Sequence, residues 1–382
     1  MRPSLFVAVI GLGVVVGMVC LGLRPVHAGQ QPSASGYKVL EPIRHGTLTV
    51  FPVVASKSYA TDEFLTLDEG LRSGEVVVTE YGNVRGLVRR SLTPAVRREN
   101  AEVNQLVLIN NSKRPLLLLA GEIVTGGKQD RVIGKDRIVP GESDPVDLSV
   151  FCVEPGRWVA TSEHFGTSGA TYGGASSGKA PVPSSLMAQP SVRAKAMGDK
   201  DQSQVWAEVR RQQQAMVTVE AAAAAPTAST GAIQSTSSYA AVMENEDVKE
   251  KVDEIARPIE HNYESLIKQL RDRKAVGVVV AVNGRIIWAD VFASTELLEK
   301  YWPKLVRSYA SEAVVTRAKG GEASLAQAEA FLGDMQGRRE TIESEPGVYR
   351  HTEVNGDGFK AFTLASLLPK TGFDVHVAKM AE

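Results

Sequence analysis

Apolar residues in the first half of the chain fall into short runs that are separated by polar turns. The runs lie at 48–54, 75–79, 105–109, 116–119, 131–139 and 146–153. Short apolar runs bounded by turn residues are typical of β-strands. Helical spacing is rare here, so this half predicts mainly antiparallel strands in a sandwich or barrel-like unit. The polar stretch 110–115 predicts a hairpin loop between two of these strands.

Helical and strand patterns alternate in the second half. Apolar residues at helical spacing predict helices over 201–219, 255–270, 297–309 and 322–335. Asn283-Gly284, between two apolar runs, predicts a two-residue hairpin turn, and residues 355–358 predict a second hairpin. Ser294 is expected to cap the third helix, and Pro303 to kink or split it. The whole pattern predicts an α+β fold.

Composition divides the chain into four parts. Residues 1–28 precede a β-rich domain at 37–162, which contains a Gly-Gly-Lys-Gln-Asp-Arg loop. Residues 163–241, with stretches rich in Gly, Ser, Ala and Pro, predict a low-complexity linker with one helix. Residues 242–382 predict an α+β domain that packs on the first.

The first 28 residues have the features of an export segment. Arg2 precedes an unbroken apolar run of 19 residues from Leu5 to Leu23. Such a run is longer than a usual signal core and about long enough to span a bilayer. Val26, His27 and Ala28 fit the small-x-small cleavage rule. The sequence predicts a cleaved signal peptide and a periplasmic or extracellular protein. The alternative is an uncleaved N-terminal anchor, and only through such an anchor is the protein expected to contact a membrane.

Charge and cysteine content exclude several classes of protein. Without Arg2 and Arg24 the chain keeps 41 basic and 44 acidic side chains, a net charge of −3. This balance argues against a nucleic-acid-binding surface. Cys152, the one cysteine beyond residue 28, lies among apolar residues and predicts a buried structural thiol. The histidines stand singly, so no metal site is predicted. No pattern names a cofactor or a protein partner.

The densest cluster of polar residues lies at 120–131, Ala-Gly-Glu-Ile-Val-Thr-Gly-Gly-Lys-Gln-Asp-Arg. Gly126 and Gly127 allow backbone conformations denied to other residues, and their N–H groups can form an anion-binding nest. Lys128 offers a point charge, and Arg131 offers a planar fork for carboxylate or phosphate. The segment therefore predicts a site for a polar or anionic small molecule.

Simpler structural interpretations stand beside this one. A Gly-Gly turn with flanking charges also occurs as a solvated hairpin loop. A Walker phosphate loop is excluded, because Gly127 stands where the lysine belongs and no hydroxyl residue follows Lys128. Glu122 follows a buried run and is expected to need Arg131 or another cation as its partner. Asp136 is expected to be solvated, and Asp290 is either a weak site candidate or an exposed strand residue.

The segment 120–131, together with 150–158 (Val-Phe-Cys-Val-Glu-Pro-Gly-Arg-Trp), resembles the domain family named for its association with ADP-ribosylglycohydrolases and rhodanese-phosphatases. Supporting matches at 48–53, 204–209 and 276–292 spread the resemblance over most of the chain. The resemblance implies an accessory domain with a hint of ADP-ribose or nucleotide metabolism. The candidate ligand residues that it implies are Glu122, Gly126, Gly127, Lys128, Gln129, Asp130, Arg131, Glu154, Arg157 and Trp158.

Three functional hypotheses follow. The first is an exported domain that binds a polar or anionic small molecule, nucleotide or ADP-ribose-like, through the 121–131 loop. The second is a hydrolase in which Glu122, Asp130 or Glu154 acts as the general base or acid, which requires a carboxyl group whose pKa is raised. The third is a structural or protein-interaction module of the cell envelope.

Overall fold

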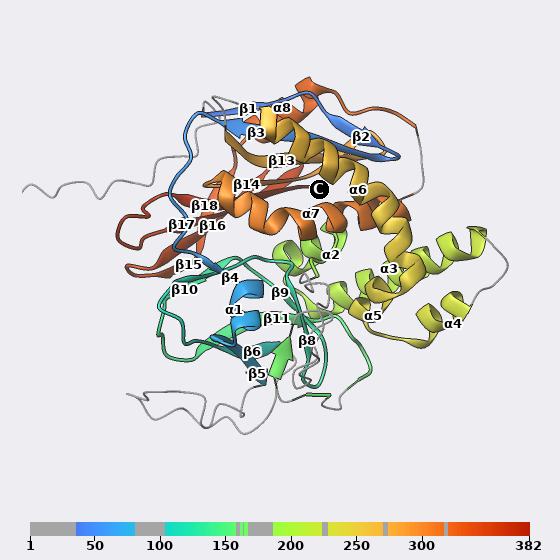
Figure 1. The fold of residues 1–382 in the computed structure, drawn as a ribbon, viewed down its shortest axis with the longest axis horizontal. Coiled ribbons are helices and arrows are strands. Elements are labelled where there is room, and N and C mark those ends of the chain that lie inside the picture. The colour runs from blue at the N-terminus through green and yellow to red at the C-terminus, as the bar shows by residue number, and fades with distance from the viewer. Residues whose placement is uncertain are drawn as a thin grey trace, which may run out of the picture. The chain divides into compact units, whose positions relative to one another are not determined.

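A nine-stranded antiparallel sheet and a closed barrel organise the chain in the computed structural model (Figure 1). The structure describes residues 36–80, 104–157, 161–162, 164–166, 186–223, 228–269, 274–316 and 320–382. Residues 34–382 form one compact unit. Helices and antiparallel strands occur in comparable amounts, which confirms the predicted α+β class and the barrel-like N-terminal part.

The large sheet joins strands from both ends of the sequence. Strand β3 (Leu48–Ala55), which is buried along its whole length, pairs with β13 (Lys274–Val282). The order across the sheet is β1-β3-β13-β14-β18-β17-β16-β15, and β2 also pairs with β3. The remaining strands are β1 (Tyr37–Val39), β2 (Ile43–His45), β14 (Arg285–Phe292), β15 (Arg338–Glu345), β16 (Tyr349–Gly356), β17 (Phe359–Ser366) and β18 (Asp374–Ala381).

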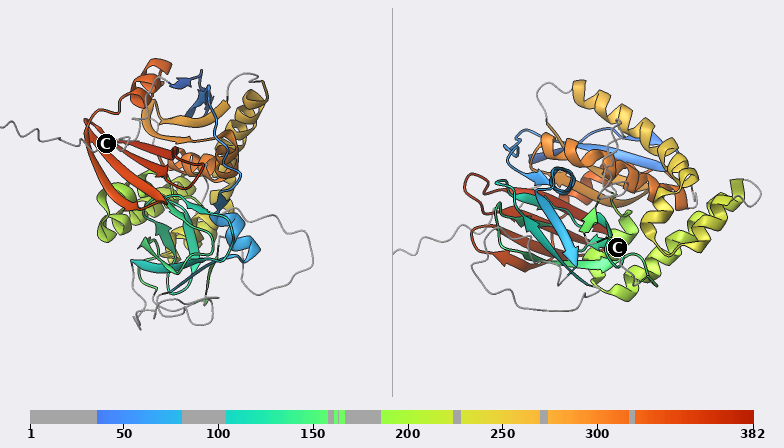
Figure 2. Two further views of the ribbon diagram at one scale, coloured as in Figure 1. Left: turned by 90° about the vertical axis from the view of Figure 1, so that its left-hand side faces the viewer. Right: turned by 60° about the horizontal axis from the view of Figure 1, so that its bottom comes forward.

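The barrel closes in the order β11-β6-β5-β12-β8-β9. Its strands are β5 (Val76–Glu80), β6 (Gln105–Asn110), β8 (Ile123–Gly126), β9 (Arg131–Ile133), β11 (Val146–Cys152) and β12 (His164–Gly166). Buried side chains such as Val78, Leu108, Val124 and Phe165 pack together in one apolar cluster. A small barrel filled in this way is a packed core and not a channel. Figure 2 shows its strands beside the C-terminal strands of the sheet.

The predicted hairpin over 110–115 is wrong. Strand β6 pairs with β5 and β11, whereas β7 (Leu116–Leu118) pairs with β10 (Arg137–Val139) and with β4 (Leu65–Thr66). The side-chain amide of Asn110 explains why the chain leaves β6 without forming a hairpin. It donates to the carbonyl oxygens of Arg114, Val139 and Pro140. The single strand expected over 131–139 is likewise divided into β9 and β10.

Helices cover the large sheet, and helices also make up much of the chain between the last barrel strand, β12, and β13 of the sheet. Helices α6 (Glu246–Gln269) and α7 (Thr295–Val315) pack together and contact β3, and α7 also contacts β13. The segment 163–241, for which the sequence predicts one helix, holds several in its described part. They are α2 (Pro190–Ala194), the π-helical turn η2 (Lys195–Asp199), α3 (Gln202–Ala223), α4 (Ala228–Ser235) and the start of α5 (Tyr239–Glu244). None of the helices in the described ranges is long and apolar enough to cross a membrane.

Short-range sequence signals predicted several local features of the second half correctly. Asn283 and Gly284 both have positive φ, 50° and 77°, as a type I′ turn requires, so the predicted hairpin of β13 and β14 is confirmed. Ser294 caps α7 by accepting a hydrogen bond from the Leu297 amide. Pro303 does not split this helix, whose buried face continues through Trp302 and Leu305. The predicted last helix is α8 (Leu325–Gly333), and α1 (Leu67–Ser73) was not predicted.

Candidate functional site

The segment 120–131 contains strand β8 and the turn that leads into β9. Its two ends lie in different surroundings. Ile123 pairs with Val132 and Val124 pairs with Arg131 across the β8–β9 ladder. The turn that joins the two strands therefore lies at one end of the barrel, which we call the barrel end. Ala120, Gly121 and Glu122 lie before β8, where they contact groups outside the barrel.

Backbone N–H groups of the turn hold oxygen atoms of the same chain. The Gly126 amide donates to Asp130 Oδ1 (3.1 Å), and the Lys128 amide donates to Glu80 Oε1 (2.9 Å). The Gly127 amide reaches Ser162 Oγ (3.1 Å), and the Asp130 amide reaches Glu154 Oε2 (3.0 Å). The turn thus presents donors to oxygen atoms, as the sequence predicts, but carboxylates of the chain occupy three of them.

Both glycines of the turn are favoured by the backbone, and the glycine at position 127 also leaves room for neighbouring side chains. Gly126 and Gly127 have φ values of 120° and 51°, in the region that favours glycine. A Cβ atom on Gly127 would lie 2.3 Å from the Phe165 ring and 2.9 Å from Glu80 Oε1. The close approach of Glu80 therefore depends on the absence of a side chain at position 127.

The second predicted group joins the turn. Arg157 donates to Glu154 through Nε (2.6 Å) and Nη2 (2.5 Å), and through Nη1 to the Gly127 carbonyl (3.0 Å). Gln129 Nε2 donates to the Glu154 carbonyl (3.0 Å). The structure therefore brings Glu154 and Arg157 together with 126–131. Trp158 lies outside the described residues.

Asp130 ties the turn to the helical region. Its Oδ2 accepts a hydrogen bond from Ser238 Oγ (2.7 Å), and Ser238 is also the N-cap of α5. Burial raises the pKa of the Asp130 carboxyl, and the neighbouring Glu154 adds to this effect. The sequence gives no sign that Ser238 joins the site, since an N-cap serine does not reveal a partner 108 residues away.

Arg131 is fully buried, and its hydrogen-bonding capacity is only partly used. Its Nη1 donates to the Gln129 carbonyl (2.7 Å), and burial lowers its pKa. Its Nε and Nη2 find no hydrogen-bond partner among the described residues, and the same is true of Glu80 Oε2 and Gln129 Oε1. Arg131 Nη2 lies 4.0 Å from Glu80 Oε1, beyond hydrogen-bonding distance. Glu80, the last residue of β5, was not among the predicted site residues.

Glu122 belongs to a separate cluster. Its Oε2 accepts a hydrogen bond from the Leu119 amide (2.7 Å), and its Oε1 accepts one from Lys304 Nζ (2.5 Å). Lys304, on α7, also donates to Asp68 Oδ2 (2.9 Å). Burial raises the pKa of Glu122, and the two carboxylates raise that of Lys304 against the effect of burial. The cation partner of Glu122 is thus Lys304 and not Arg131.

A chain of buried charges lies next to the start of the segment. His376 Nδ1 lies 2.6 Å from Asp136 Oδ2, and its Nε2 lies 3.2 Å from Asp290 Oδ1. Arg193 donates to both oxygens of Asp290 (2.9 and 3.0 Å). All four side chains are fully buried. We call them the buried charge network. The expectation that Asp136 is solvated is wrong, and so is that of an exposed strand residue at Asp290.

The network connects several elements of the fold. Asp136 follows β9 and accepts a hydrogen bond from the Ala120 amide (2.7 Å). Arg193 comes from α2, and a Cβ atom on Gly121 would lie 2.6 Å from its Cγ. Asp290 and His376 come from β14 and β18 of the large sheet. The first residues of the segment 120–131 therefore dock the barrel against α2 and the sheet.

The charge balance of this network depends on the protonation of His376. Burial by itself lowers the pKa of His376, but the carboxylates of Asp136 and Asp290 outweigh burial and raise the pKa to about 9. Arg193 and His376 hold the pKa of Asp290 well below its usual range, although burial opposes them. The histidine is therefore charged at neutral pH, donates from Nδ1 to Asp136 and forms an ion pair with Asp290.

Stability is expected to fall at alkaline pH because of His376. The contribution of its raised pKa is fully present below the ordinary value of 6.5 and is lost as the pH rises through about 9. The loss is about 3 kcal/mol in the free energy of unfolding. Lys379, whose pKa is lowered to about 8, acts in the opposite direction, so the measurement must compare two proteins. Urea unfolding at pH 6 and pH 10 should show a larger loss in the wild type than in His376→Gln; equal losses would contradict the assignment.

A model of the ARG and Rhodanese-Phosphatase-superfamily-associated Protein domain matches residues 36–380. The chain belongs to this family. The match includes the barrel, the helical segment and the large sheet, so the family domain extends over all of these elements. It confirms the resemblance inferred from residues 120–131 and 150–158. No curated protein and no solved structure matches the chain.

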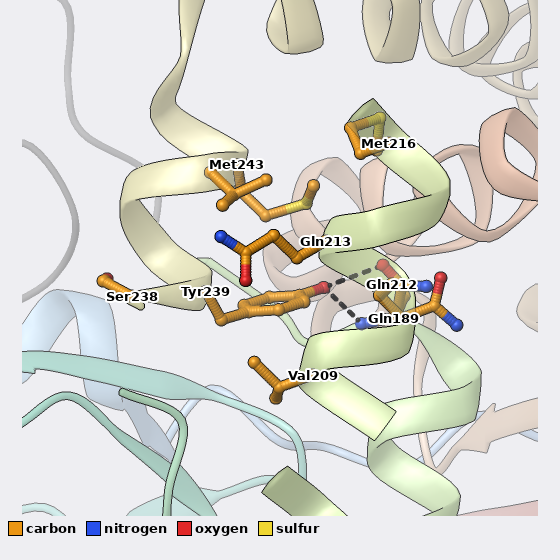
Figure 3. A pocket seen from close by; sticks show the side chains of 9 residues that line it. Gln189, Val209, Gln212, Gln213, Met216, Ser238, Tyr239 and Met243 are labelled. Atoms are coloured by element: carbon orange, nitrogen blue, oxygen red, sulfur yellow. Dashed lines mark hydrogen bonds between the residues drawn. The ribbon is translucent and has the colours of Figure 1, made fainter. Parts of the chain in front are cut away.

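A small cavity in this family member lies between α3 and α5 (Figure 3). The Tyr239 hydroxyl accepts a hydrogen bond from the backbone N–H of Gln189 (3.1 Å) beside it. The cavity measures about 10 Å³, which is room for about one water molecule. It does not offer room for a substrate. Among the described residues, no group of three His, Cys, Asp or Glu side chains is placed to hold a metal ion.

Cys152 ends strand β11 within the family domain and is buried. Its Sγ accepts a hydrogen bond from the Glu154 amide (3.3 Å), and burial raises the pKa of the thiol. A thiol with a raised pKa forms little of the reactive thiolate at neutral pH. The structure therefore confirms that Cys152 is a buried thiol.

Proposed function

We propose that the protein, after export, binds a polar or anionic small molecule at the barrel end. The observation that carries this proposal is the fully buried Arg131, two of whose nitrogen atoms find no hydrogen-bond partner among the described residues. Nearly all buried polar atoms in folded proteins have a partner, and a buried donor without one is costly. A ligand oxygen on Nε and Nη2 would remove this cost.

The surroundings of Arg131 support a small ligand with acceptor atoms. Gln129 Oε1 and Glu80 Oε2 are also without a hydrogen-bond partner among the described residues, so the cluster offers acceptors as well as donors. Lys128 and Arg157 are only partly buried and place positive charge at the rim of the cluster. The hydrogen bonds of Asp130 and Glu154 hold the turn rigid, and a rigid site loses less conformational entropy on binding.

Ligand binding is expected to raise the melting temperature. The protein, expressed as the full chain, would be screened against carboxylates, inorganic phosphate, sugar phosphates, nucleotides and ADP-ribose. A ligand at ten times its Kd should raise the melting temperature by about 2–4 °C. Lys128→Ala should reduce this shift, measured from the melting temperature of the variant itself.

Lys113→Ala provides the matched control. Lys113 is exposed and lies beyond β6, and the register of β5 with β6 places it at the opposite end of the barrel from Glu80. This variant should respond as the wild type does. A ligand shift that is the same in Lys128→Ala, or the absence of a shift with every compound, would oppose the proposal and favour a structural or interaction module.

A hydrolase is a second candidate, which the carboxyl pair of Asp130 and Glu154 favours. Both carboxyl groups are buried at the barrel end. The raised pKa of Asp130 is the property that a general acid needs. Glu122 is excluded from this role by its distance along β8 and its engagement with Lys304. Product analysis of the nucleotide and ADP-ribose samples in the same screen distinguishes hydrolysis from binding.

A further inference from the structure

The carboxylate of Glu80 lies at the barrel end, beside the Lys128 amide and Arg131. Its Oε1 accepts the hydrogen bond of the Lys128 amide (2.9 Å), and Gly127 leaves the space through which it approaches. The side chain is about 7% exposed. A backbone N–H group next to a buried arginine is a set of donors that suits a carboxylate.

The pairing of Glu80 with Arg131 is nevertheless incomplete. The shortest distance between them is 4.0 Å, whereas a charge-assisted hydrogen bond measures about 2.7–2.9 Å. Glu80 Oε2 on one side, and Arg131 Nε and Nη2 on the other, make no hydrogen bond to any described residue. Arg193 and Asp290 show the alternative within the same protein, because their two hydrogen bonds use both carboxylate oxygens. Glu80 thus lies in the site but leaves the Nε and Nη2 donors of Arg131 without hydrogen bonds.

We propose that Glu80 is a built-in occupant of a carboxylate site, and that a small carboxylate ligand replaces it on the Lys128 amide and the Arg131 guanidinium. This inference rests on the proposed function and names the ligand class. A planar group with two oxygens matches the arginine fork, whose Nε and Nη2 point in nearly the same direction. Glu80 then competes with the ligand and lowers its apparent affinity.

The ligand must be small and flat. The cluster is almost completely buried, and Phe165 and Gly127 are in close contact next to Glu80. A carboxylate with one or two carbon atoms in total is no larger than the part of Glu80 that it replaces. Formate and acetate are therefore suitable probes.

Chemical rescue tests this inference directly. Glu80→Gln keeps the shape of the side chain but removes the carboxylate that lies beside Arg131 Nη2, and breaking a buried pair in this way is destabilising. In 100 mM formate this variant should melt about 2–4 °C higher than in chloride of equal ionic strength. The wild type should show a smaller difference. The double variant Glu80→Gln/Arg131→Met should show none, because the charge that binds formate is gone.

Glu75→Gln is the matched control, because Glu75 is exposed and directly precedes β5, at the opposite end of that strand from Glu80. It should gain no response to formate. If Glu80→Gln does not fold in chloride, recovery of folded protein in formate gives the same answer, and Glu80→Asp provides a milder variant. A Glu80→Gln or Glu80→Asp response no larger than that of the wild type overturns the inference. If the wild type still binds another compound of the screen, the proposed function stands without it.

Discussion

An Asp290→Asn variant is expected to lose about 3–5 kcal/mol of the free energy of unfolding. Asp290 is fully buried and accepts two hydrogen bonds from Arg193, and it also lies 3.2 Å from His376. Tyr309 donates a further hydrogen bond to it. The substitution leaves two buried cations with one remaining carboxylate, Asp136. Urea unfolding at pH 7, followed by circular dichroism, measures the loss.

Asp199→Asn is the control for this prediction. Asp199 pairs with Lys195 on the same turn of chain, and both side chains are 36% exposed. A surface pair of this kind contributes about 0.5 kcal/mol or less. The double variant Arg193→Met/Asp290→Asn should cost less than the sum of the two single variants, because the second change removes a charge that the first has left unpaired. Additive losses, or a loss in Asp290→Asn as small as that in Asp199→Asn, would contradict the role of the network.

A Lys304→Met variant is expected to lose about 3 kcal/mol of the free energy of unfolding at pH 8. Lys304 lies between Glu122 and Asp68, so its removal leaves a fully buried carboxyl group without a cation. Burial already raises the pKa of Glu122, and the variant raises it further. A raised carboxyl pKa destabilises the protein only above the unfolded value of 4.5, where the unfolded state releases its proton more readily. The loss should therefore be smaller at pH 5 than at pH 8.

Lys300→Met provides a control on the same helix. Lys300 lies one turn earlier on α7 and pairs with Glu69 and Glu296 at partly exposed positions. Its replacement should cost about 1 kcal/mol or less. Adding Glu122→Gln to Lys304→Met should restore part of the lost stability at pH 8. A loss that is equal for the two lysines, or that does not depend on pH, would show that Glu122 is not the group left unpaired.

The secondary structure followed from the sequence wherever neighbouring residues determine it. The strands β3, β5, β6 and β11, the helix α3 and the hairpin at Asn283-Gly284 lie where the pattern predicts them. Apolar runs, turn residues and helix caps act over a few positions, so the sequence alone contains the information. The hairpin over 110–115 failed for the opposite reason: the Asn110 side chain bonds to carbonyl oxygens 29 and 30 residues away.

The residue types of the site also followed from the sequence, but their partners did not. Gly126, Gly127, Asp130 and Arg131 do meet Glu154 and Arg157, because strands β8, β9 and β11 are neighbours in the barrel. Glu80 and Ser238 join them from positions about 50 and 108 residues away in the sequence. No local pattern marks a side chain whose partner is brought near by strand pairing or by a helix cap.

By itself, the sequence determined that this chain has an α+β fold with antiparallel strands, that it belongs to its family, and that residues 120–131 are a centre of polar interactions. Only the tertiary structure decided that this segment has two ends with different roles. One end is held by Asp136, Arg193 and Lys304, and the other forms the barrel end around Arg131. The physical reason is that a charge can be buried only beside groups that compensate it, and those groups come from elements far apart in the chain.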